Sequence, residues 1–156
     1  MTTIAWDGRI MAADRQATRE NGLISSVQKL WRPKPNIIAG FSGALDECVA
    51  LKAWFDNGAD PKEYPKPEDI NNAPVMMFVI KGSSTLFCFE GLPFAIPFLN
   101  VPHSRGSGAA VALGAMFMGA NAIRALEITS RLDAFTGEGI DWAGFDEEGT
   151  LPFLTE

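Results

Sequence analysis

The stretch Thr2-Thr3-Ile4-Ala5-Trp6-Asp7-Gly8-Arg9-Ile10-Met11-Ala12-Ala13 decides how the rest of the chain is interpreted. Asp7-Gly8 between two β-prone runs is the strongest short-range signal of a β-hairpin. Removal of Met1 would leave Thr2 with a hydroxyl and a free α-amine, whose reference pKa of about 7.7 to 8.0 suits it to take the hydroxyl proton. The alternative is that Thr2-Thr3 only starts a β-strand, and these two residues alone favour that alternative.

The composition indicates one globular domain that spans residues 1–156. The chain is 47% hydrophobic and 21% charged, and its length allows a sizeable core. The formal net charge is -6 and no basic stripe occurs, which argues against a nucleic-acid-binding protein.

Cysteine and histidine usage argues against a zinc site. Cys48, Cys88 and the single His103 do not have zinc-ligand spacing, so free thiols in a reducing compartment are expected. The start of the chain lacks the features of a signal peptide, and no run of about 18 apolar residues occurs. The sequence therefore predicts a cytoplasmic protein that is neither secreted nor inserted in a membrane.

Hydrophobic patterning predicts strands, a helix, strands, two helices and a final strand, with Pro33 and Pro35 interrupting one ladder. The expected strands are Thr2–Trp6, Arg9–Ala13, Leu23–Trp31, Asn36–Phe41, Val75–Lys81, Thr85–Glu90 and Gly139–Phe145, with an interrupted strand in the Pro-rich segment Leu92–Pro102. The expected helices are Leu45–Phe55 and, within Ser107–Asp133, either two successive helices or one kinked helix with a break near Gly119-Ala120-Asn121. This order predicts an α+β fold in which two sheets pack face to face with helices outside.

Six short motifs occur in an order that resembles one known family. They are Thr2-Thr3, Ala13-Asp14-Arg15-Gln16-Ala17-Thr18, Lys29, Ser42-Gly43-Ala44, Gly106-Ser107-Gly108 and Asp133-Ala134-Phe135-Thr136-Gly137. Together they resemble the proteasome β-type subunits and HslV peptidases, which are N-terminal nucleophile (Ntn) hydrolases. The resemblance implies a four-layer αββα sandwich of two packed antiparallel sheets flanked by helices.

The resemblance also implies a catalytic set around Thr2, the nucleophile once Met1 is removed. Lys29 matches the lysine that lowers the proton affinity of the hydroxyl and the amine, and Asp14 matches the buried aspartate that orients this lysine. Without the family, Lys29 is more often an outward-pointing strand residue and Asp14 a turn former.

Four further positions match the family's active-site loops. Gly43 matches the oxyanion N–H donor, Ser107 a proton-relaying serine, and Asp133 and Thr136 the polar network around the amine. Their alternative roles are a turn glycine, a helix N-cap and an ordinary helix-ending loop. Serine is commoner in relatives than threonine at position 136.

By position, the peptide substrate would lie as an added strand between segments at Thr18 and Leu45. Phe41 matches the floor of the first specificity pocket and predicts a preference for small or medium apolar side chains. Gln16 stands where many relatives have arginine, which puts the support of Asp14 in question.

The chemistry requires no cofactor. The resemblance also implies a structural Na, K or Mg ion near the loop after the last long helix, with the backbone carbonyls of Ser130, Asp133 and Thr136 as candidate ligands.

The resemblance implies a threonine endopeptidase that degrades unfolded proteins inside homo-oligomeric stacked rings fed by an ATP-dependent AAA+ unfoldase. Apolar helix faces would support assembly, and the expected residues are Val111, Leu113, Met116, Phe117 and Met118; the alternative, more common for a stripe of methionine and aromatic residues, is that they belong to the core. Two alternatives stay open: an Ntn amidohydrolase that acts on a small amide, and a catalytically silent ring subunit that retains Met1.

Overall fold

The first of two β-sheets contains the N-terminal hairpin at its centre. The computed structural model describes residues 2–99 and 101–155, and this sheet has the antiparallel strand order β10-β1-β2-β11. Its strands are β10 (His103–Gly106), β1 (Thr3–Trp6), β2 (Ile10–Asp14) and β11 (Ile140–Gly144). The Asp7 carboxylate accepts hydrogen bonds from the backbone N–H groups of Arg9 (2.8 Å) and Ile10 (2.7 Å) and so closes the predicted hairpin.

The second sheet has five antiparallel strands in the order β5-β6-β7-β8-β9. They are β5 (Leu30–Lys34), β6 (Ile37–Ser42), β7 (Val75–Ile80), β8 (Leu86–Phe89) and β9 (Ile96–Phe98). A two-stranded ribbon of β3 (Gln16–Thr18) and β4 (Ile24–Ser26) extends from the N-terminal half.

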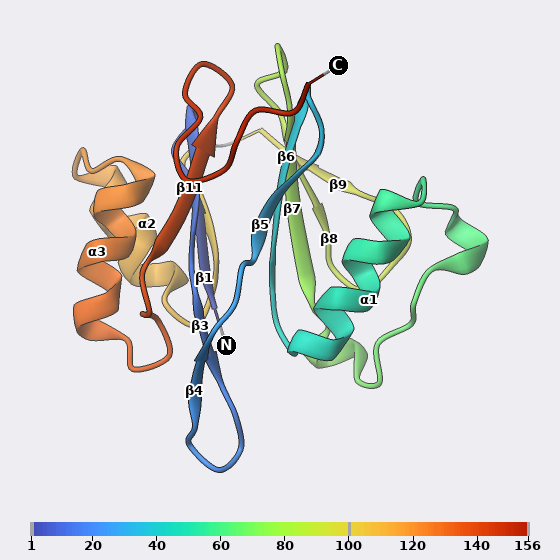
Figure 1. The fold of residues 1–156 in the computed structure, drawn as a ribbon, viewed down its shortest axis with the longest axis horizontal. Coiled ribbons are helices and arrows are strands. Elements are labelled where there is room, and N and C mark those ends of the chain that lie inside the picture. The colour runs from blue at the N-terminus through green and yellow to red at the C-terminus, as the bar shows by residue number, and fades with distance from the viewer. Residues whose placement is uncertain (1, 100, 156) are drawn as a thin grey trace.

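Three α-helices cover the outer faces of the two sheets (Figure 1). They are α1 (Leu45–Asp56), α2 (Ala109–Phe117) and α3 (Ala122–Leu132), and the 3-10 turns Pro61–Glu63 and Ile70–Asn72 follow α1. The break between α2 and α3 lies where it was predicted, because Gly119 has a φ of +107° and the Asn121 side chain caps α3 by accepting from the Arg124 N–H.

Three hydrophobic clusters join the layers. The cluster between the two sheets contains Ile4, Met11, Leu30 and Met77. The cluster under α2 and α3 contains Ala5, Ala12, Ala125 and Leu126. The cluster under α1 contains Phe41, Cys48, Leu51 and Trp54. The alanines let the two helices approach β1 and β2 closely. The result is a four-layer αββα sandwich, which confirms the predicted α+β fold.

Strand boundaries differ from the prediction in four places. No strand was predicted at Gln16–Thr18, which forms β3. The segment Leu23–Trp31 forms two strands, β4 and β5, instead of one. Strand β5 continues through Pro33, with a register shift between Trp31 and Lys34; this is possible because β5 is an edge strand and an edge residue needs no partner for its missing N–H. Strand β10 was not predicted, because His103-Ser104-Arg105-Gly106 shows no apolar alternation and follows a Pro-rich segment.

Within residues 2–99 and 101–155, each helix falls short of the length and hydrophobicity that a bilayer crossing requires.

Candidate active site

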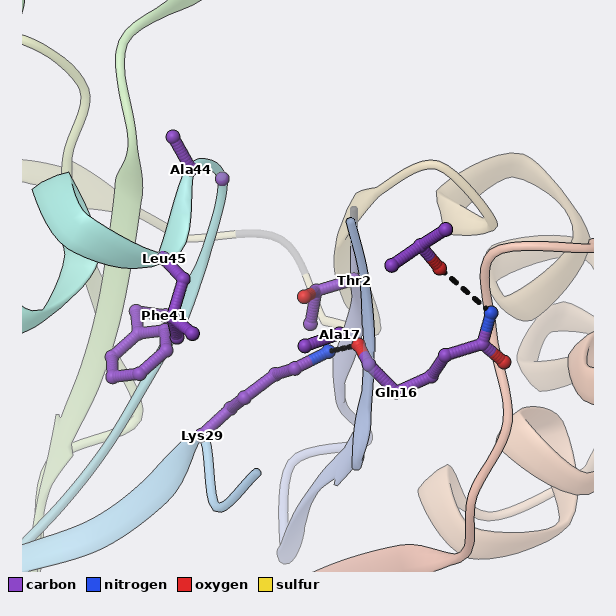
Figure 2. Close-up of a pocket in the computed structure, with 9 residues that line it drawn as sticks. Thr2, Gln16, Ala17, Lys29, Phe41, Ala44 and Leu45 are labelled. Carbon is purple, nitrogen blue, oxygen red and sulfur yellow. Dashed lines mark hydrogen bonds between the residues drawn. The ribbon is translucent and has the colours of Figure 1, made fainter. Parts of the chain in front are cut away.

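Thr2 lines a small cavity to which β3, β6 and the start of α1 also contribute residues (Figure 2). The Thr2 side chain is 3% exposed, and the cavity has a volume of about 100 Å³. The other lining residues are Gln16, Ala17, Thr18, Lys29, Phe41, Gly43, Ala44 and Leu45. All six positions that the sequence assigned to the nucleophile, the lysine, the oxyanion donor and the substrate segments therefore meet in one place.

Lys29 and Asp14 form a buried ion pair next to this cavity. The Lys29 Nζ donates to Asp14 Oδ1 at 3.2 Å and to the Gln16 carbonyl, and the two side chains are 2% and 0% exposed. Burial lowers the pKa of Lys29, although the Asp14 charge opposes this shift. Lys29 is thus a buried amine whose proton is held less tightly than that of an exposed lysine.

The Asp14 carboxylate is also saturated by backbone donors. It accepts hydrogen bonds from the N–H groups of Thr3 (3.0 Å), Gln16 (3.2 Å) and Gly137 (3.1 Å). These donors come from β1, β3 and the loop after α3, so Asp14 ties together three segments that surround Thr2. Such bonds compensate the cost of burying a carboxylate.

The backbone of Thr2 is fixed by the segment that leads from β10 into α2. The Thr2 carbonyl accepts from the Ser107 N–H at 3.1 Å and from the Ser42 hydroxyl at 3.3 Å. Gly106 has a φ of +104°, and a Cβ added there would lie 1.5 Å from the Thr2 carbonyl oxygen. Only glycine allows this close approach.

A second polar cluster surrounds the Asp133 carboxylate. Its Oδ2 accepts from the hydroxyls of Ser107 and Thr136, each at 2.6 Å, and its Oδ1 accepts from the Phe135 N–H at 3.2 Å. Burial raises the pKa of Asp133, but these three hydrogen bonds outweigh it, and the net pKa lies below the usual value. Asp133 is therefore an anion at neutral pH.

Thr3 links β1 to this second cluster, a role that the sequence interpretation missed. The Thr3 hydroxyl is fully buried, lies 2.7 Å from the Thr136 hydroxyl and accepts from the Gly108 N–H at 3.0 Å. Successive residues of a strand face opposite sides, so Thr2 shares the inter-sheet face with Ile4 and Thr3 shares the α2/α3 face with Ala5. The signal in the sequence was a single polar residue, Thr3, on a strand face whose other residues are apolar.

Gln16 provides the support that its substitution for arginine had put in question. Its backbone N–H donates to Asp14, and its side-chain amide donates to the Thr18 hydroxyl at 3.0 Å and to the Ala134 carbonyl at 2.9 Å. Arg15 instead pairs with Asp141 on β11 at 2.6 Å, and this partner raises the pKa of Arg15.

Gly43 connects β6 to α1 with a φ of +138°. A Cβ at this position would lie 2.9 Å from the Cα of Pro74, so a larger residue would be both strained and crowded. Its backbone faces the Thr2 cavity just ahead of the N-terminus of α1, where the helix dipole favours negative charge.

The cation site at Ser130, Asp133 and Thr136 stays a prediction. Ser130 is exposed and its hydroxyl donates to the Glu127 carbonyl, while the side chains of Asp133 and Thr136 bond to each other. Ser130 lines a different cavity of about 450 Å³, on the α3 side of Asp14. Among the described residues, His, Cys, Asp and Glu side chains form no group of three or more that could hold a metal.

No protein-family model and no curated protein matches the sequence. The structure is similar to the crystal structure of eukaryotic HslV from Trypanosoma brucei, with a TM-score of 0.69 and 19% sequence identity. The match covers 91% of this chain and 97% of the HslV chain. Two sheets, their helical layers and the N-terminal hairpin are therefore arranged in this chain as an HslV-like fold of the proteasome β type.

Proposed function

We propose that this chain is a threonine endopeptidase in which Thr2, after removal of Met1, attacks the scissile carbonyl of a peptide. The observation that carries the proposal is that Thr2, just before β1, and Lys29 line the same cavity, and that Lys29 is held there by the buried Asp14 carboxylate. A strand-initiating threonine needs no buried ion pair beside it, whereas a hydroxyl nucleophile benefits from one.

In the first step, the Thr2 hydroxyl gives its proton to the Thr2 α-amine while Oγ bonds to the substrate carbonyl carbon. The nearby Lys29 ammonium stabilises the developing alkoxide, and its lowered pKa lets it share a proton readily. The Gly43 N–H, at the positive end of α1, donates to the oxyanion. The C–N bond then breaks as the α-ammonium returns its proton to the leaving amine, and an ester remains on Thr2.

In the second step, water attacks the ester and gives its proton to the α-amine. The C–Oγ bond breaks and Oγ regains a proton, which restores Thr2. Ser107 contacts the Thr2 carbonyl through its N–H and Asp133 through its hydroxyl, so this pair supplies a polar, anionic neighbour for the α-ammonium in both steps.

The cavity dimensions support a peptide with a small or medium apolar side chain. Phe41 lines the cavity beside Thr2 and limits it to about 100 Å³. A neighbouring and mainly apolar cavity of about 620 Å³, which Thr18, Val27, Leu45 and Val49 help to line, offers room for the following residues of an extended chain. Backbone of β3 and of the segment before α1 would bind the substrate as an added strand.

Exposed apolar side chains support assembly into homo-oligomeric rings and action on unfolded proteins delivered by an ATP-dependent partner, in the cytoplasm. Phe117 and Met118 at the end of α2 are 71% and 89% exposed, and Leu99 is 82% exposed, whereas Met116 is buried in the core. Large apolar side chains that stay exposed on one subunit are available for contacts with a neighbouring subunit.

Intact mass spectrometry and covalent labelling test the proposal. We expect a mass that lacks Met1, labelling of Thr2 by a peptide epoxyketone, and loss of peptide cleavage in Thr2→Ala with unchanged thermal stability. Retention of Met1 in the purified protein would contradict the proposal and favour a silent subunit, because a blocked amine cannot act as the base. Cleavage of small amides but not of peptides would favour the amidohydrolase alternative.

A further inference from the structure

The Gln16 side chain lines the cavity and forms hydrogen bonds both to β3, the expected substrate segment, and to the loop after α3. Gln16 is 5% exposed. Its amide N–H groups donate to the Thr18 hydroxyl on β3 at 3.0 Å and to the Ala134 carbonyl at 2.9 Å (Figure 2 shows the first of these bonds). A carboxamide has two N–H donors, so both are used.

The loop that receives the second bond carries the residues around Asp133. Ala134 follows Asp133 directly, and Gly137 passes so close to Gln16 that an added Cβ would lie 2.7 Å from the Gln16 Oε1. The same loop returns a hydrogen bond from the Gly137 N–H to Asp14. One buried side chain therefore links β3 at Thr18 to the loop after α3.

We propose that Gln16 is a positioning residue that couples occupancy of β3 by a peptide to the placement of the Asp133 loop. An extended peptide that pairs with β3 would fix the backbone at Thr18. Through its two hydrogen bonds, Gln16 would then fix Ala134, which is next to Asp133, the residue whose carboxylate accepts from the Ser107 hydroxyl. The inference rests on the proposed peptidase activity.

Neutrality of the side chain is part of this role. Lys29 already donates to the Gln16 carbonyl, and Asp14 already has one cationic partner. A second cation here would compete with Lys29 for Asp14, whereas a carboxamide supplies two donors without any charge. Gln16 thus connects β3 to the loop after α3 and leaves the charge of the Lys29–Asp14 ion pair unchanged.

Steady-state kinetics of Gln16→Met tests the coupling, because methionine has a similar length and shape but no donor. We expect kcat for a peptide substrate to fall about tenfold with KM changed less than about twofold, in keeping with the usual net effect of losing one or two buried hydrogen bonds on an enzyme. Gln28→Met is the matched control, since Gln28 is exposed and its amide bonds only to the Leu30 carbonyl. Its kinetics should equal those of the wild type.

The pH profile of Gln16→Glu provides a second readout that a purely structural role would not move. The introduced carboxylate cannot donate, but its protonated form can donate one hydrogen bond. Asp14 and Lys29 are the charged groups nearest this backbone, and burial beside Asp14 raises the pKa of the introduced carboxyl group. The ratio of Gln16→Glu activity to wild-type activity should therefore increase as the pH falls from 8 to 5.

Labelling by a peptide epoxyketone separates failure of this inference from failure of the proposed function. A wild-type protein that is not labelled at Thr2 contradicts the peptidase itself. A labelled wild type combined with unchanged kcat in Gln16→Met, or with a rise in KM alone, overturns the coupling. Should Gln16→Met fail to fold, Thr18→Val removes the acceptor at the other end of the bond, and an unchanged kcat in that variant would equally overturn the inference.

Discussion

The Lys29 ammonium lies 3.2 Å from the Asp14 carboxylate, and both side chains are almost completely shielded from water. A buried pair of this kind contributes less to stability than its geometry suggests, because both charges lose their hydration. Removing only one partner is much more costly, since the other charge is left without compensation.

Asp14→Asn should reduce the free energy of unfolding at pH 7 by about 3 to 5 kcal/mol and abolish peptide cleavage. Without Asp14 the pKa of Lys29 falls further, so the unfolded chain binds more protons than the folded chain below the ordinary lysine pKa. The variant's stability should thus rise as the pH increases towards about 10.5, and the rise should begin at lower pH than in the wild type. Urea unfolding at pH 7, 8, 9 and 10 measures this. Arg124→Gln, which breaks an exposed pair with Glu127, should change stability by less than about 1 kcal/mol.

Gly106→Ala should abolish activity and destabilise the protein, because the new Cβ would collide with the Thr2 carbonyl oxygen and the backbone would be held at a positive φ. Gly114→Ala is the control: Gly114 lies within α2 and a Cβ there meets no atom within 4 Å. The control should raise the free energy of unfolding by about 0.5 to 1 kcal/mol through helix propensity. Thermal melts and peptide cleavage distinguish the two, and an active Gly106→Ala would contradict the described fit.

Thr3→Val should leave the Gly108 N–H without its acceptor and remove one of the two hydrogen-bond contacts of the Thr136 hydroxyl, which keeps Asp133. The expected loss is about 1 to 3 kcal/mol of stability, the typical cost of unsatisfied buried polar groups, together with reduced kcat. Thr85→Val, which changes a partly exposed threonine at the start of β8, should leave both quantities unchanged. Equal behaviour of the two variants in denaturant titrations would show that the Thr3 hydroxyl has no supporting role.

Phe41→Leu should enlarge the cavity beside Thr2 and increase cleavage after large apolar residues by about tenfold relative to cleavage after alanine. Fluorogenic peptides that end in Ala, Leu, Phe and Arg measure the ratio of kcat/KM. Phe78→Leu, on β7 and away from the cavity, also removes part of a core ring but should keep the wild-type preference. Fastest wild-type cleavage after Arg would contradict the role given to Phe41.

Neither cysteine should react with iodoacetamide at pH 8 in the folded protein. Burial raises the pKa of Cys48 and of Cys88 to about 12, so the reactive thiolate is scarce. Peptide mass mapping after alkylation measures this, with urea-unfolded protein as the positive control. Loss of peptide cleavage on alkylation of the folded protein would point to a thiol nucleophile in place of Thr2.

Local signals in the sequence were sufficient for most of the fold. Asp7-Gly8 specified the first hairpin, and the apolar spacing in Leu45–Phe55 specified α1, because in both places the local preference agrees with the final packing. Strand β10 could not be predicted in the same way. Its four residues become a strand only because β1 offers an unpaired edge and Gly106 lets the two backbones meet.

The candidate site likewise contains residues that local motifs predict and residues that they do not. Thr2, Asp14 and Lys29 could be proposed from ordered motifs, because each of these side chains is tied to one chemical task. The contributions of Thr3 and Gln16 depend on which segments lie across from them, at separations of 133 and 118 residues along the chain, and no local pattern encodes such contacts.

Strand β1 is an interior strand, with β10 on one side and β2 on the other. Thr2, which precedes β1, is therefore buried and lines the cavity, so any segment fused ahead of it would begin at the cavity wall. An affinity tag at the amino end would occupy the place where a peptide is expected to bind, and incomplete removal would leave an obstructed protein that still folds normally. Tags intended for functional work belong after Glu156, at the carboxyl end of the chain.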